Sequence, residues 1–410
     1  MIGENSVCHQ RSCAAQNQHQ NPHAKAEIPH KLIIVHAYRL LGGDHRDCRG
    51  QPLTETGRAV NTEPKFAQTL LEWHRHYGRH DLPWQGTRDP YPIWVSEIML
   101  QQTQVTTVIP YYRQFMQRFP TVTALAAATQ DELLDCWTGL GYYARARNLH
   151  RAARRVVDER AGCFPEQFDE VLDLPGIGRS TAGAILAFAF GQRHAILDGN
   201  VKRVLARCFA VAGYPGDTAV ARELWALSER CTPRQDVPSY TQAIMDLGST
   251  VCTRRNPQCG GCPLASHCQA LARQEIDRYP GSRPKRKRPL RHVTMILVLN
   301  TDGCVLLERR PAEGIWGGLW SFPECPAEET TAAFCRRYLG TAVTIDQPWP
   351  ALRHGFTHFE LSIQPQPVRY AGQDDKVLHG AERIWYKPGS APARGLAAPV
   401  RKLLNNLETN

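Results

Sequence analysis

Four cysteines lie close together in the sequence, with a spacing that is typical of a metal or cluster site. The spacing is Cys252-x6-Cys259-x2-Cys262-x5-Cys268. Four thiolates on one short loop suit a tetrahedral zinc ion or a [4Fe–4S] cluster. The spacing alone favours zinc, because zinc sites are commoner, and four unrelated core cysteines would rarely cluster so tightly. Arg254 and Arg255 lie inside the loop, so a bound metal would fix two cations at the surface.

Two carboxylates occupy positions where they could do acid–base chemistry. Glu97 lies in an apolar stretch that runs into a series of amides, and Asp198 lies between Leu197 and Gly199, ahead of a basic helix. Asp198 could simply cap that helix, and Glu97 could be an exposed helix acid. In one cleft, burial would raise the pKa of one carboxyl, and a cation or helix dipole would keep the other ionised. Cleavage of a glycosidic bond needs this division of roles.

A third signal is Leu174-Pro175-Gly176-Ile177-Gly178, which separates two segments with helical apolar periodicity. Gly176 and Gly178 allow a tight hairpin with bare backbone N–H groups at a helix start, which is an anion-binding geometry. A plain helix–helix turn is the alternative interpretation. Ser180 follows the second glycine by two positions.

These residues must be positioned by helices over most of the chain. Phe66, Leu70, Trp73 and Tyr77 form one apolar stripe, which predicts a helix that starts at Pro64 and ends at Gly78. Further helical periodicity, punctuated by proline and glycine, continues to about residue 250 with almost no alternating pattern. The sequence therefore predicts an all-α domain.

The pattern changes after residue 291. An apolar run over 293–299, the turn residues Asp302-Gly303 and the segment 305–307 predict two paired strands. Residues 356–363 are predicted to form another strand. The C-terminal part is therefore expected to be a separate α+β domain.

Length and charge set the domain organisation. At roughly 100–200 residues per domain, 410 residues predict two or three domains. We expect a disordered extension over 1–63, an all-α domain over 64–273, a basic linker over 274–291 and an α+β domain over 292–408. The net charge is +10, and residues 283–291 hold six Lys or Arg and no Asp or Glu. Such a run binds polyanions without reading sequence, or is simply a solvated linker.

The sequence lacks membrane and secretion signals. No apolar run approaches the roughly 20 residues of a membrane span, and the N-terminus has no secretory layout. We therefore expect a cytoplasmic protein with reduced thiols.

The chain resembles the MutY family of adenine DNA glycosylases, which belongs to the helix-hairpin-helix superfamily that includes endonuclease III. The resemblance runs from about Lys65 to the C-terminus. Its most diagnostic segments are Ser96 to Gln104, Gly139 to Arg147, Ile196 to Arg203 and the cysteine loop. It implies a helix-hairpin-helix core with a [4Fe–4S] cluster on the four cysteines, in place of the zinc that spacing favours.

The resemblance also implies the chemistry and the partner. Glu97 is expected to protonate adenine N7, and ionised Asp198 to stabilise an oxocarbenium-like sugar, directly or through a transient covalent adduct. Asn200 and the Gly199 backbone would position the sugar and water. The expected partner is duplex DNA with adenine opposite 8-oxoguanine or guanine, bound by a monomer associated with the nucleoid. Tyr142 would wedge into the gap and Gln102 would contact the bases left behind, although Tyr142 could also be a core aromatic. DNA contacts are expected from Gly176, Gly178, Arg203, Arg254 and Arg255.

Ser180 predicts how the reaction ends. Relatives that also nick the strand carry a lysine at this hairpin position, and its amine forms a Schiff base with the sugar. A hydroxyl cannot form that imine, so adenine release should leave an intact abasic strand. Lys202 lies near the active-site segment and could give weak covalent trapping.

The C-terminal part resembles a Nudix domain. Leu306 to Pro311 and Gly314 to Pro323 match the stretch ahead of a Nudix box, but the acidic set that binds Mg²⁺ does not follow. We therefore expect a non-hydrolytic domain that reads 8-oxoguanine through Phe356, Thr357 and His358. Thr357 stands where serine is usual. Simple packing of a β face is the alternative, above all for the phenylalanines.

Three functions compete at this point. The first is a monofunctional adenine glycosylase. The second is a bifunctional glycosylase and lyase for damaged pyrimidines, which Ser180 and the Nudix-like domain oppose. The third is a non-catalytic DNA-binding protein or a hydrolase of oxidised nucleotides. The two carboxylates oppose a non-catalytic protein, and the missing acidic set opposes the hydrolase.

Overall fold

A computed structural model describes residues 62–284, 288–372, 382–390 and 395–409 of the chain. The expected N-terminal extension lies outside the described residues, apart from its last two positions. Three of the basic residues between 283 and 291, at positions 285–287, also lie outside them. No described helix combines the length and apolar character needed to cross a membrane.

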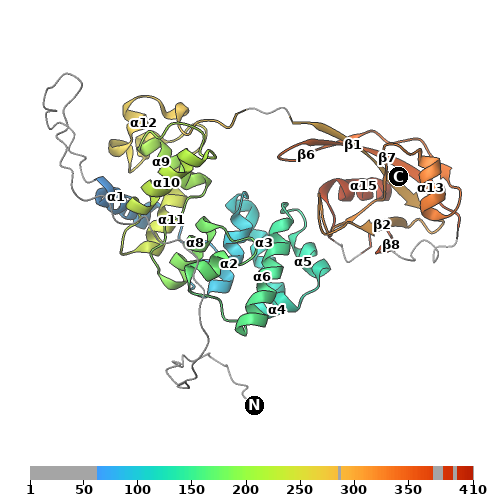
Figure 1. Cartoon of the computed structure of the whole chain (residues 1–410), viewed down its shortest axis with the longest axis horizontal. Helices are drawn as coiled ribbons and strands as arrows, with labels where there is room; N and C mark the ends of the chain where they lie inside the picture. Colours follow the sequence, from blue (N-terminus) through green and yellow to red (C-terminus); the bar gives the residue numbers. More distant parts are fainter. Residues whose placement is uncertain (1–61, 285–287, 373–381, 391–394, 410) are drawn as a thin grey trace, which may run out of the picture. The chain divides into compact units, whose positions relative to one another are not determined.

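Helices make up the N-terminal part, from residue 62 to residue 278, and Figure 1 colours them from blue to yellow. They are α1 (Thr62–Tyr77), α2 (Pro90–Leu100), α3 (Val105–Arg118), α4 (Val122–Ala127), α5 (Gln130–Trp137), α6 (Ala144–Arg160), α7 (Phe168–Leu172), α8 (Arg179–Phe190), α9 (Gly199–Cys208), α10 (Thr218–Cys231), α11 (Val237–Asp246), η1 (Leu247–Val251), η2 (Cys259–Gly261), η3 (Ala265–His267), α12 (Gln269–Ala272) and η4 (Ile276–Arg278). The prediction of an all-α domain is confirmed for these residues.

The first helix begins two residues before the expected Pro64 and ends, as predicted, just before Gly78. Its stripe is only partly buried. Phe66 and Leu70 are fully packed, whereas Tyr77 is 75% exposed. The prediction that Tyr77 belongs to the core stripe is wrong, because its side chain lies mostly in solvent.

The C-terminal part is a mixed eight-stranded sheet with helices on both faces. Its elements are β1 (Leu290–Leu299), β2 (Val305–Arg309), β3 (Trp320–Ser321), β4 (Glu324–Cys325), α13 (Thr331–Leu339), β5 (Thr344–Ile345), β6 (Leu352–Gly355), β7 (Glu360–Arg369), β8 (Arg383–Tyr386) and α15 (Ala398–Thr409). The central strands β1 and β7 are parallel, with Leu290 opposite Glu360 and Leu299 opposite Arg369. All the other strand pairs are antiparallel.

Alternation along β1 explains the two helical layers. Ile296 and Val298 pack in a cluster with Phe334 of α13, while Met295 and Leu297 pack in a cluster with residues of α15. Successive side chains of a strand point to opposite faces, so both faces of this apolar strand are covered. The expected hairpin is also present, because β2 pairs with β1 and Gly303 has a φ of +70° in the turn.

Residues 356–363 do not form one strand. β6 pairs with β7, with Gly355 opposite Glu360, and the backbone N–H of Phe356 donates to the Phe359 carbonyl at 2.9 Å. The expected 8-oxoguanine-reading residues therefore form the tight turn between two strands.

Two elements fall inside the segment that was expected to be a linker, 274–291. η4 lies near its start, and β1 begins at its last two residues. Tyr279 is 8% exposed, and its carbonyl accepts a hydrogen bond from Arg207 at 3.0 Å. Secondary structure and buried side chains thus occur within the segment that the basic composition suggested to be a linker.

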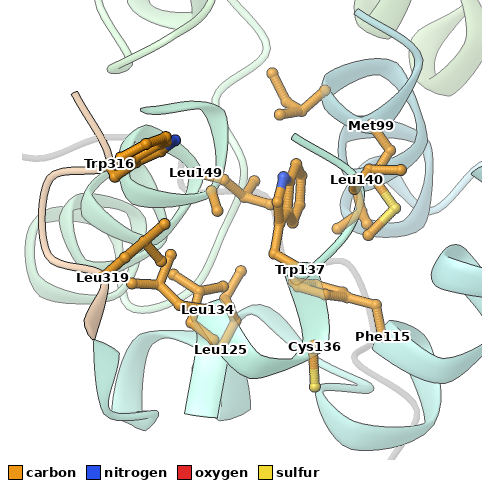
Figure 2. Packing of buried hydrophobic residues seen from close by; sticks show 14 of the residues in the cluster. Met99, Phe115, Leu125, Leu134, Cys136, Trp137, Leu140, Leu149, Trp316 and Leu319 are labelled. Carbon is orange, nitrogen blue, oxygen red and sulfur yellow. The ribbon is translucent and has the colours of Figure 1, made fainter. Parts of the chain in front are cut away.

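One apolar cluster includes residues of both parts. Figure 2 shows Trp316 and Leu319, which precede β3, beside Leu134 of α5 and Leu149 of α6. All four side chains are buried.

Candidate active site

Glu97 occupies the last two turns of α2. That helix begins after Asp89, whose carboxylate accepts the Tyr91 N–H at 3.0 Å, and it has Pro90 at its first position. Most of the helix is buried, but Glu97 lines a cavity of about 380 Å³. Trp84, Gln85, Arg88 and Gln242 are among the other residues that line it. The alternative of an exposed helix acid is therefore wrong for Glu97. The expectation of one cleft that holds both carboxyls is met for Glu97 only, because Asp198 is not among the residues that line this cavity.

The surroundings of Glu97 favour its protonated form. Burial raises the pKa of Glu97 to about 8, and the nearby negative charge of Asp198 adds to the rise. This electrostatic contact joins two carboxyls that are about a hundred residues apart in sequence. Asp198 does not line the cavity, so Glu97 is the carboxyl that faces the space for a ligand.

Asp198 caps α9 and also has a second contact. Its Oδ1 accepts the Val201 N–H at 2.8 Å, as the capping interpretation predicted. Its Oδ2 accepts from the Asn200 side-chain amide at 3.2 Å. Burial raises the pKa of Asp198, and the hydrogen bonds from Val201 and Asn200 together with the charge of Arg203 oppose that rise. The contacts from Val201, Asn200 and Arg203 thus act against protonation of Asp198.

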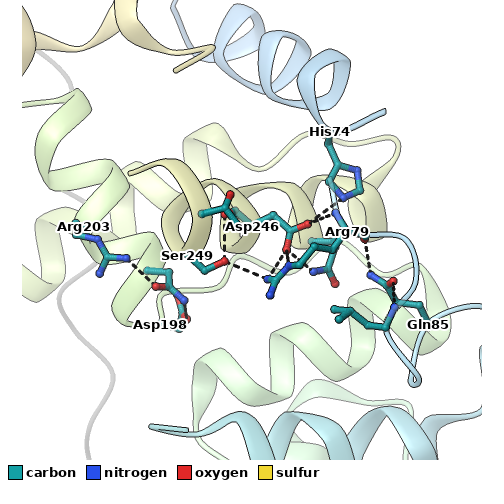
Figure 3. Close-up of polar contacts among 11 residues, drawn as sticks. His74, Arg79, Gln85, Asp198, Arg203, Asp246 and Ser249 are labelled. Atoms are coloured by element: carbon teal, nitrogen blue, oxygen red, sulfur yellow. Dashed lines mark hydrogen bonds and ion pairs between the residues drawn. The ribbon is translucent and has the colours of Figure 1, made fainter. Parts of the chain in front are cut away.

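Arg203 connects Asn200 to the cysteine loop, and Figure 3 shows Arg203 beside Asp198. Its guanidinium donates to Asn200 Oδ1 at 2.8 Å, to the Cys252 carbonyl at 2.7 Å and to the Gly248 carbonyl. Arg203 was expected to contact DNA, but its guanidinium is half-buried and bonded to the protein. Asn200 and Arg203 are one helical turn apart, a spacing that could have suggested this contact.

The short π-helix η1 presses against Asn200. A Cβ added to Gly248 would lie 2.6 Å from the Asn200 Cβ, so only glycine fits at this position. π-helical turns of this kind often occur at functional sites. Gly248 was not among the predicted site residues.

A buried ion pair lies beside the same π-helix. Asp246 is fully buried and accepts from the Arg79 backbone N–H and Nε, each at 2.8 Å, and from Gln242 at 2.8 Å (Figure 3). Burial alone would raise the pKa of Asp246, but the contact with the His74 imidazole, 3.6 Å away, and the hydrogen bonds from Arg79 outweigh it and lower the pKa. The sequence analysis missed this network, which holds α1, α11 and the chain ahead of α2 together.

The predicted hairpin joins α7 and α8. Gly176 has a φ of +83°, and a Cβ there would lie 2.7 Å from Asn148, whereas a Cβ at Gly178 would meet nothing within 4 Å. Both glycines are exposed, so the backbone at the start of α8 is open to a ligand. The Ser180 hydroxyl accepts the Leu197 N–H at 2.9 Å and so ties the hairpin to the segment that carries Asp198.

The two expected DNA-contacting loops have unusual backbone geometry. Gln102 has a φ of +58° and Tyr142 a φ of +49°, although neither is glycine. Tyr142 is 52% exposed, so the alternative of a core aromatic is wrong. Both side chains extend from short loops, after α2 and before α6.

The four cysteines line one apolar pocket with side chains such as Val204, Leu247 and Ile276. No three His, Cys, Asp or Glu side chains within the described ranges lie close enough to hold a single metal ion. A pocket lined by four thiols fits a [4Fe–4S] cluster. Arg207 Nη1 donates to Cys252 Sγ at 3.4 Å, as suits an anionic centre. Arg254 and Arg255 are exposed on this loop.

The turn between β6 and β7 exposes Thr357 and His358. Phe356 and Phe359 stack beneath it at 4.5 Å, and Trp316 lies 5.4 Å from Phe356. The packing interpretation thus applies to the phenylalanines, whereas the hydroxyl and the imidazole face outwards.

Three family models match the chain in the order of these features. Residues 95–230 match the HhH-GPD superfamily of base excision DNA repair proteins, and residues 252–268 match the iron–sulfur binding domain of endonuclease III. Residues 294–406 match the NUDIX domain. The helical core, the [4Fe–4S] loop and the Nudix domain are thereby confirmed.

Individual relatives were also found. The adenine DNA glycosylase of Buchnera aphidicola from Acyrthosiphon pisum is 34% identical over 345 residues, which cover 84% of this chain and 98% of that protein. The human adenine DNA glycosylase is 35% identical over 377 residues, covering 77% of this chain and 69% of that protein. A solved thermostable thymine-DNA glycosylase matches 52% of this chain and 97% of its own, with 28% identity and a TM-score of 0.46.

The Buchnera relative is matched over nearly its full length, and the match includes the segments that carry Glu97, Asp198 and the four cysteines. The chain belongs to the adenine DNA glycosylase family of base excision repair enzymes.

Proposed function

We propose that the protein hydrolyses the N-glycosidic bond of adenine paired with 8-oxoguanine or guanine and leaves an abasic site in an intact strand. One observation carries the proposal. Glu97, a carboxyl with a pKa raised to about 8, lines a cavity and lies within electrostatic reach of Asp198. Burial raises the pKa of Asp198 as well, but hydrogen bonds from Val201 and Asn200 and the charge of Arg203 oppose that rise. The proposed reaction needs a protonated Glu97 and an ionised Asp198. The DNA substrate belongs to the chromosome, so the proposed place of action is the nucleoid. The proposed active form is a monomer.

The target adenine must first leave the base stack. Extrusion of a base costs a few kcal/mol, and an inserted side chain lowers that cost by filling the gap. Tyr142, exposed at a loop tip, fills the gap, and Gln102 contacts the bases that stay behind. Backbone N–H groups at Gly176 and Gly178 and the cations Arg254 and Arg255 bind the phosphates.

Glu97 then acts as the general acid. Adenine leaves poorly as an anion, so protonation of its ring at N7 makes departure feasible. With a pKa of about 8, Glu97 holds this proton at neutral pH. Its place on the cavity wall puts the carboxyl where an extruded base would lie.

Asp198 stabilises the sugar that remains. Bond cleavage leaves an oxocarbenium-like charge, and an ionised carboxylate nearby offsets it. The Asn200 amide, itself held by Arg203, keeps Asp198 oriented and helps to place the attacking water. Glu97→Gln and Asp198→Asn should each abolish adenine release and leave DNA binding largely intact. Single-turnover release by either variant would contradict these roles.

Ser180 supports a monofunctional reaction. Its hydroxyl binds the backbone ahead of Asp198, and it has no amine to form a Schiff base. Borohydride should therefore trap little covalent complex, with Lys202 the source of any weak product. Trapping in high yield would contradict this assignment.

The C-terminal domain reads the base opposite adenine through Phe356, Thr357 and His358. Thr357 and His358 are exposed at a turn that stacked aromatic rings support from below. We expect the domain to be non-hydrolytic, because the acidic set that would hold Mg²⁺ does not follow the segment that ends at Pro323. Two carboxylates that do follow it are in ion pairs. Glu324 pairs with Arg310, and Glu329 pairs with Arg337 at 2.7 Å.

A [4Fe–4S] cluster is held by Cys252, Cys259, Cys262 and Cys268. When bound, the cluster supplies a rigid structural centre for this loop. Arg203 and Arg207 bind the loop through the Cys252 and Thr253 carbonyls, each at 2.7 Å. Cysteine ligation on one side and arginine contacts on the other keep Arg254 and Arg255 at the surface.

One experiment tests the proposed function. A duplex with 8-oxoguanine opposite labelled adenine is incubated with the protein, with and without later alkali treatment. Cleavage of the adenine strand only after alkali supports the proposal, whereas cleavage without alkali indicates a lyase. Absence of cleavage, with turnover of the 8-oxo-dGTP nucleotide, would overturn it in favour of a nucleotide hydrolase.

A further inference from the structure

Arg145, in the first turn of α6, is a buried cation beside two exposed loops. Its side chain is only 8% exposed. Burial lowers the pKa of Arg145 to about 10, so it remains charged at neutral pH. A buried charge is costly unless hydrogen bonds satisfy it, so the partners of this guanidinium show what its burial achieves.

One set of partners lies at the end of α2, next to Gln102. Arg145 Nη1 donates to the carbonyls of Ile98, Met99 and Gln101 at 3.0, 2.7 and 2.6 Å. Nη2 donates to the Thr103 hydroxyl at 3.2 Å. The last carbonyls of a helix lack intrahelical partners, and here one guanidinium bonds carbonyls at the end of α2 before Gln102 and the Thr103 hydroxyl after it.

The other set of partners lies next to Tyr142. Arg145 Nη2 donates to the carbonyls of Leu140 and Gly141 at 3.3 and 3.1 Å. The Gly141 carbonyl also accepts from the Trp137 indole at 3.1 Å. The guanidinium carbon lies 5.6 Å from the centre of the Tyr142 ring. A single side chain therefore bonds the backbone of both loops.

Both loops store backbone strain at the residue that protrudes. Gln102 and Tyr142 have φ values of +58° and +49°, a left-handed conformation that is strained for residues other than glycine. It persists only where surrounding contacts fix it. Arg145 bonds Gln101 and Gly141, the residues directly before Gln102 and Tyr142. It also bonds Thr103, the residue directly after Gln102.

We infer that Arg145 is a positioning residue that joins the Gln102 and Tyr142 loops into one rigid pair, so that both side chains enter the duplex together at a fixed separation. The inference rests on the proposed function, in which these two side chains occupy the space that the extruded adenine leaves. It adds that neither loop positions its side chain independently. Arg145 itself does not touch the substrate.

A double-mutant cycle measures this coupling in the full-length protein. Tyr142→Ala, Gln102→Ala and the double variant are compared by single-turnover adenine release from the 8-oxoguanine duplex. The fluorescence of 2-aminopurine beside the target base reports extrusion. In the wild-type background the two effects should depart from additivity by about fivefold or more.

The cycle is repeated with Arg145→Lys, which keeps the charge but cannot span both loops. Release should slow by about 100-fold, because small displacements of positioning groups have effects of this size. The coupling between Tyr142 and Gln102 should fall to within about twofold of additivity. Coupling that survives this substitution would show that the DNA links the two side chains, and would overturn the inference.

Matched variants keep the test decisive. Arg154→Lys changes an arginine of the same helix that donates to the Ala126 and Ala128 carbonyls, at 3.2 and 3.4 Å, and it should leave release and coupling unchanged. If Arg145→Lys does not fold, Thr103→Val removes one bond on the Gln102 side and should weaken the coupling. Unchanged coupling in Thr103→Val would then overturn the inference. Absence of adenine release by the wild-type protein would instead refute the proposed function.

Discussion

Glu97 combines a raised pKa with a proposed role that requires its proton. Since burial and the Asp198 charge raise the pKa of Glu97 to about 8, the acid is protonated below this pH and loses its proton above it. Single-turnover adenine release should therefore fall as the pH rises through about 8. The measurement is a rate profile between about pH 6 and pH 9.5. A rate that stays constant up to the alkaline end would exclude Glu97 as the general acid.

The same burial should make Glu97 costly for stability. The pKa of Glu97 is higher in the folded protein than the ordinary value of 4.5, so ionisation opposes folding above about pH 4.5, increasingly up to about pH 8. Glu97→Gln should therefore increase the free energy of unfolding by about 1–3 kcal/mol at neutral pH and by little in acid. Denaturant unfolding at two pH values checks this, with the exposed Glu72→Gln as control. A destabilised Glu97→Gln at pH 7 would contradict it.

At the scale of elements, η1 sets the position of the residues around Asp198. Gly248→Ala would place a methyl group 2.6 Å from the Asn200 Cβ, so Asn200 must move. Its side-chain hydrogen bond to Asp198 would then be displaced as well. We expect kcat to fall by about 100-fold while the cluster is retained. Gly260→Ala is the control, because a Cβ there meets nothing within 4 Å. Equal activity of the two variants would show that Asn200 does not depend on η1.

The cysteine loop should act through its exposed cations. Arg254→Ala combined with Arg255→Ala should weaken binding to any duplex. The slope of log K against log salt should fall by the amount expected for the loss of about two phosphate contacts. Chelation of the iron should have a similar effect, with loss of the broad absorption near ~400 nm. Fluorescence anisotropy over a salt series measures both. Arg273→Ala, just beyond the loop, is the control, and an unchanged salt slope in the double variant would contradict the assignment.

Much of the site could be predicted because its parts are local in sequence. The cysteines lie within residues 252–268, and the hairpin and both carboxylates lie in short distinctive segments. The long-range contacts could not be predicted. Arg79 meets Asp246, and Arg203 meets Gly248, only because the helices pack as they do.

The fold was also predicted unevenly. Apolar periodicity identified α1 but could not show that Tyr77, in its last turn, is exposed. The alternation over 356–363 hid a hairpin, because the turn residues Thr357 and His358 give no glycine or proline signal. The register of this hairpin is therefore known only from the pairing of β6 with β7.

At the scale of the whole molecule, polar contacts accompany the apolar cluster that includes both parts. Asp131 of α5 pairs with Arg309 at 2.6 Å, Arg147 donates to the Gly317 carbonyl at 2.7 Å, and the Tyr143 hydroxyl donates to the Leu396 carbonyl at 3.2 Å. Asp131→Asn combined with Arg147→Met should uncouple the helical and sheet parts at a cost of about 1–3 kcal/mol. Calorimetry should then resolve two unfolding transitions. Arg151→Met, an exposed change on the same helix, is the control, and a single transition in the double variant would contradict the prediction.

The parallel pairing of β1 with β7 has a consequence for biosynthesis. The four cysteines and all the helices that surround them are translated before β1, whereas β1 must wait for β7 before the centre of the sheet can close. On the ribosome, iron and sulfide can therefore be inserted into the helical scaffold while the strands of the sheet domain are still emerging. A nascent chain that ends near residue 289 should already accept its inorganic centre.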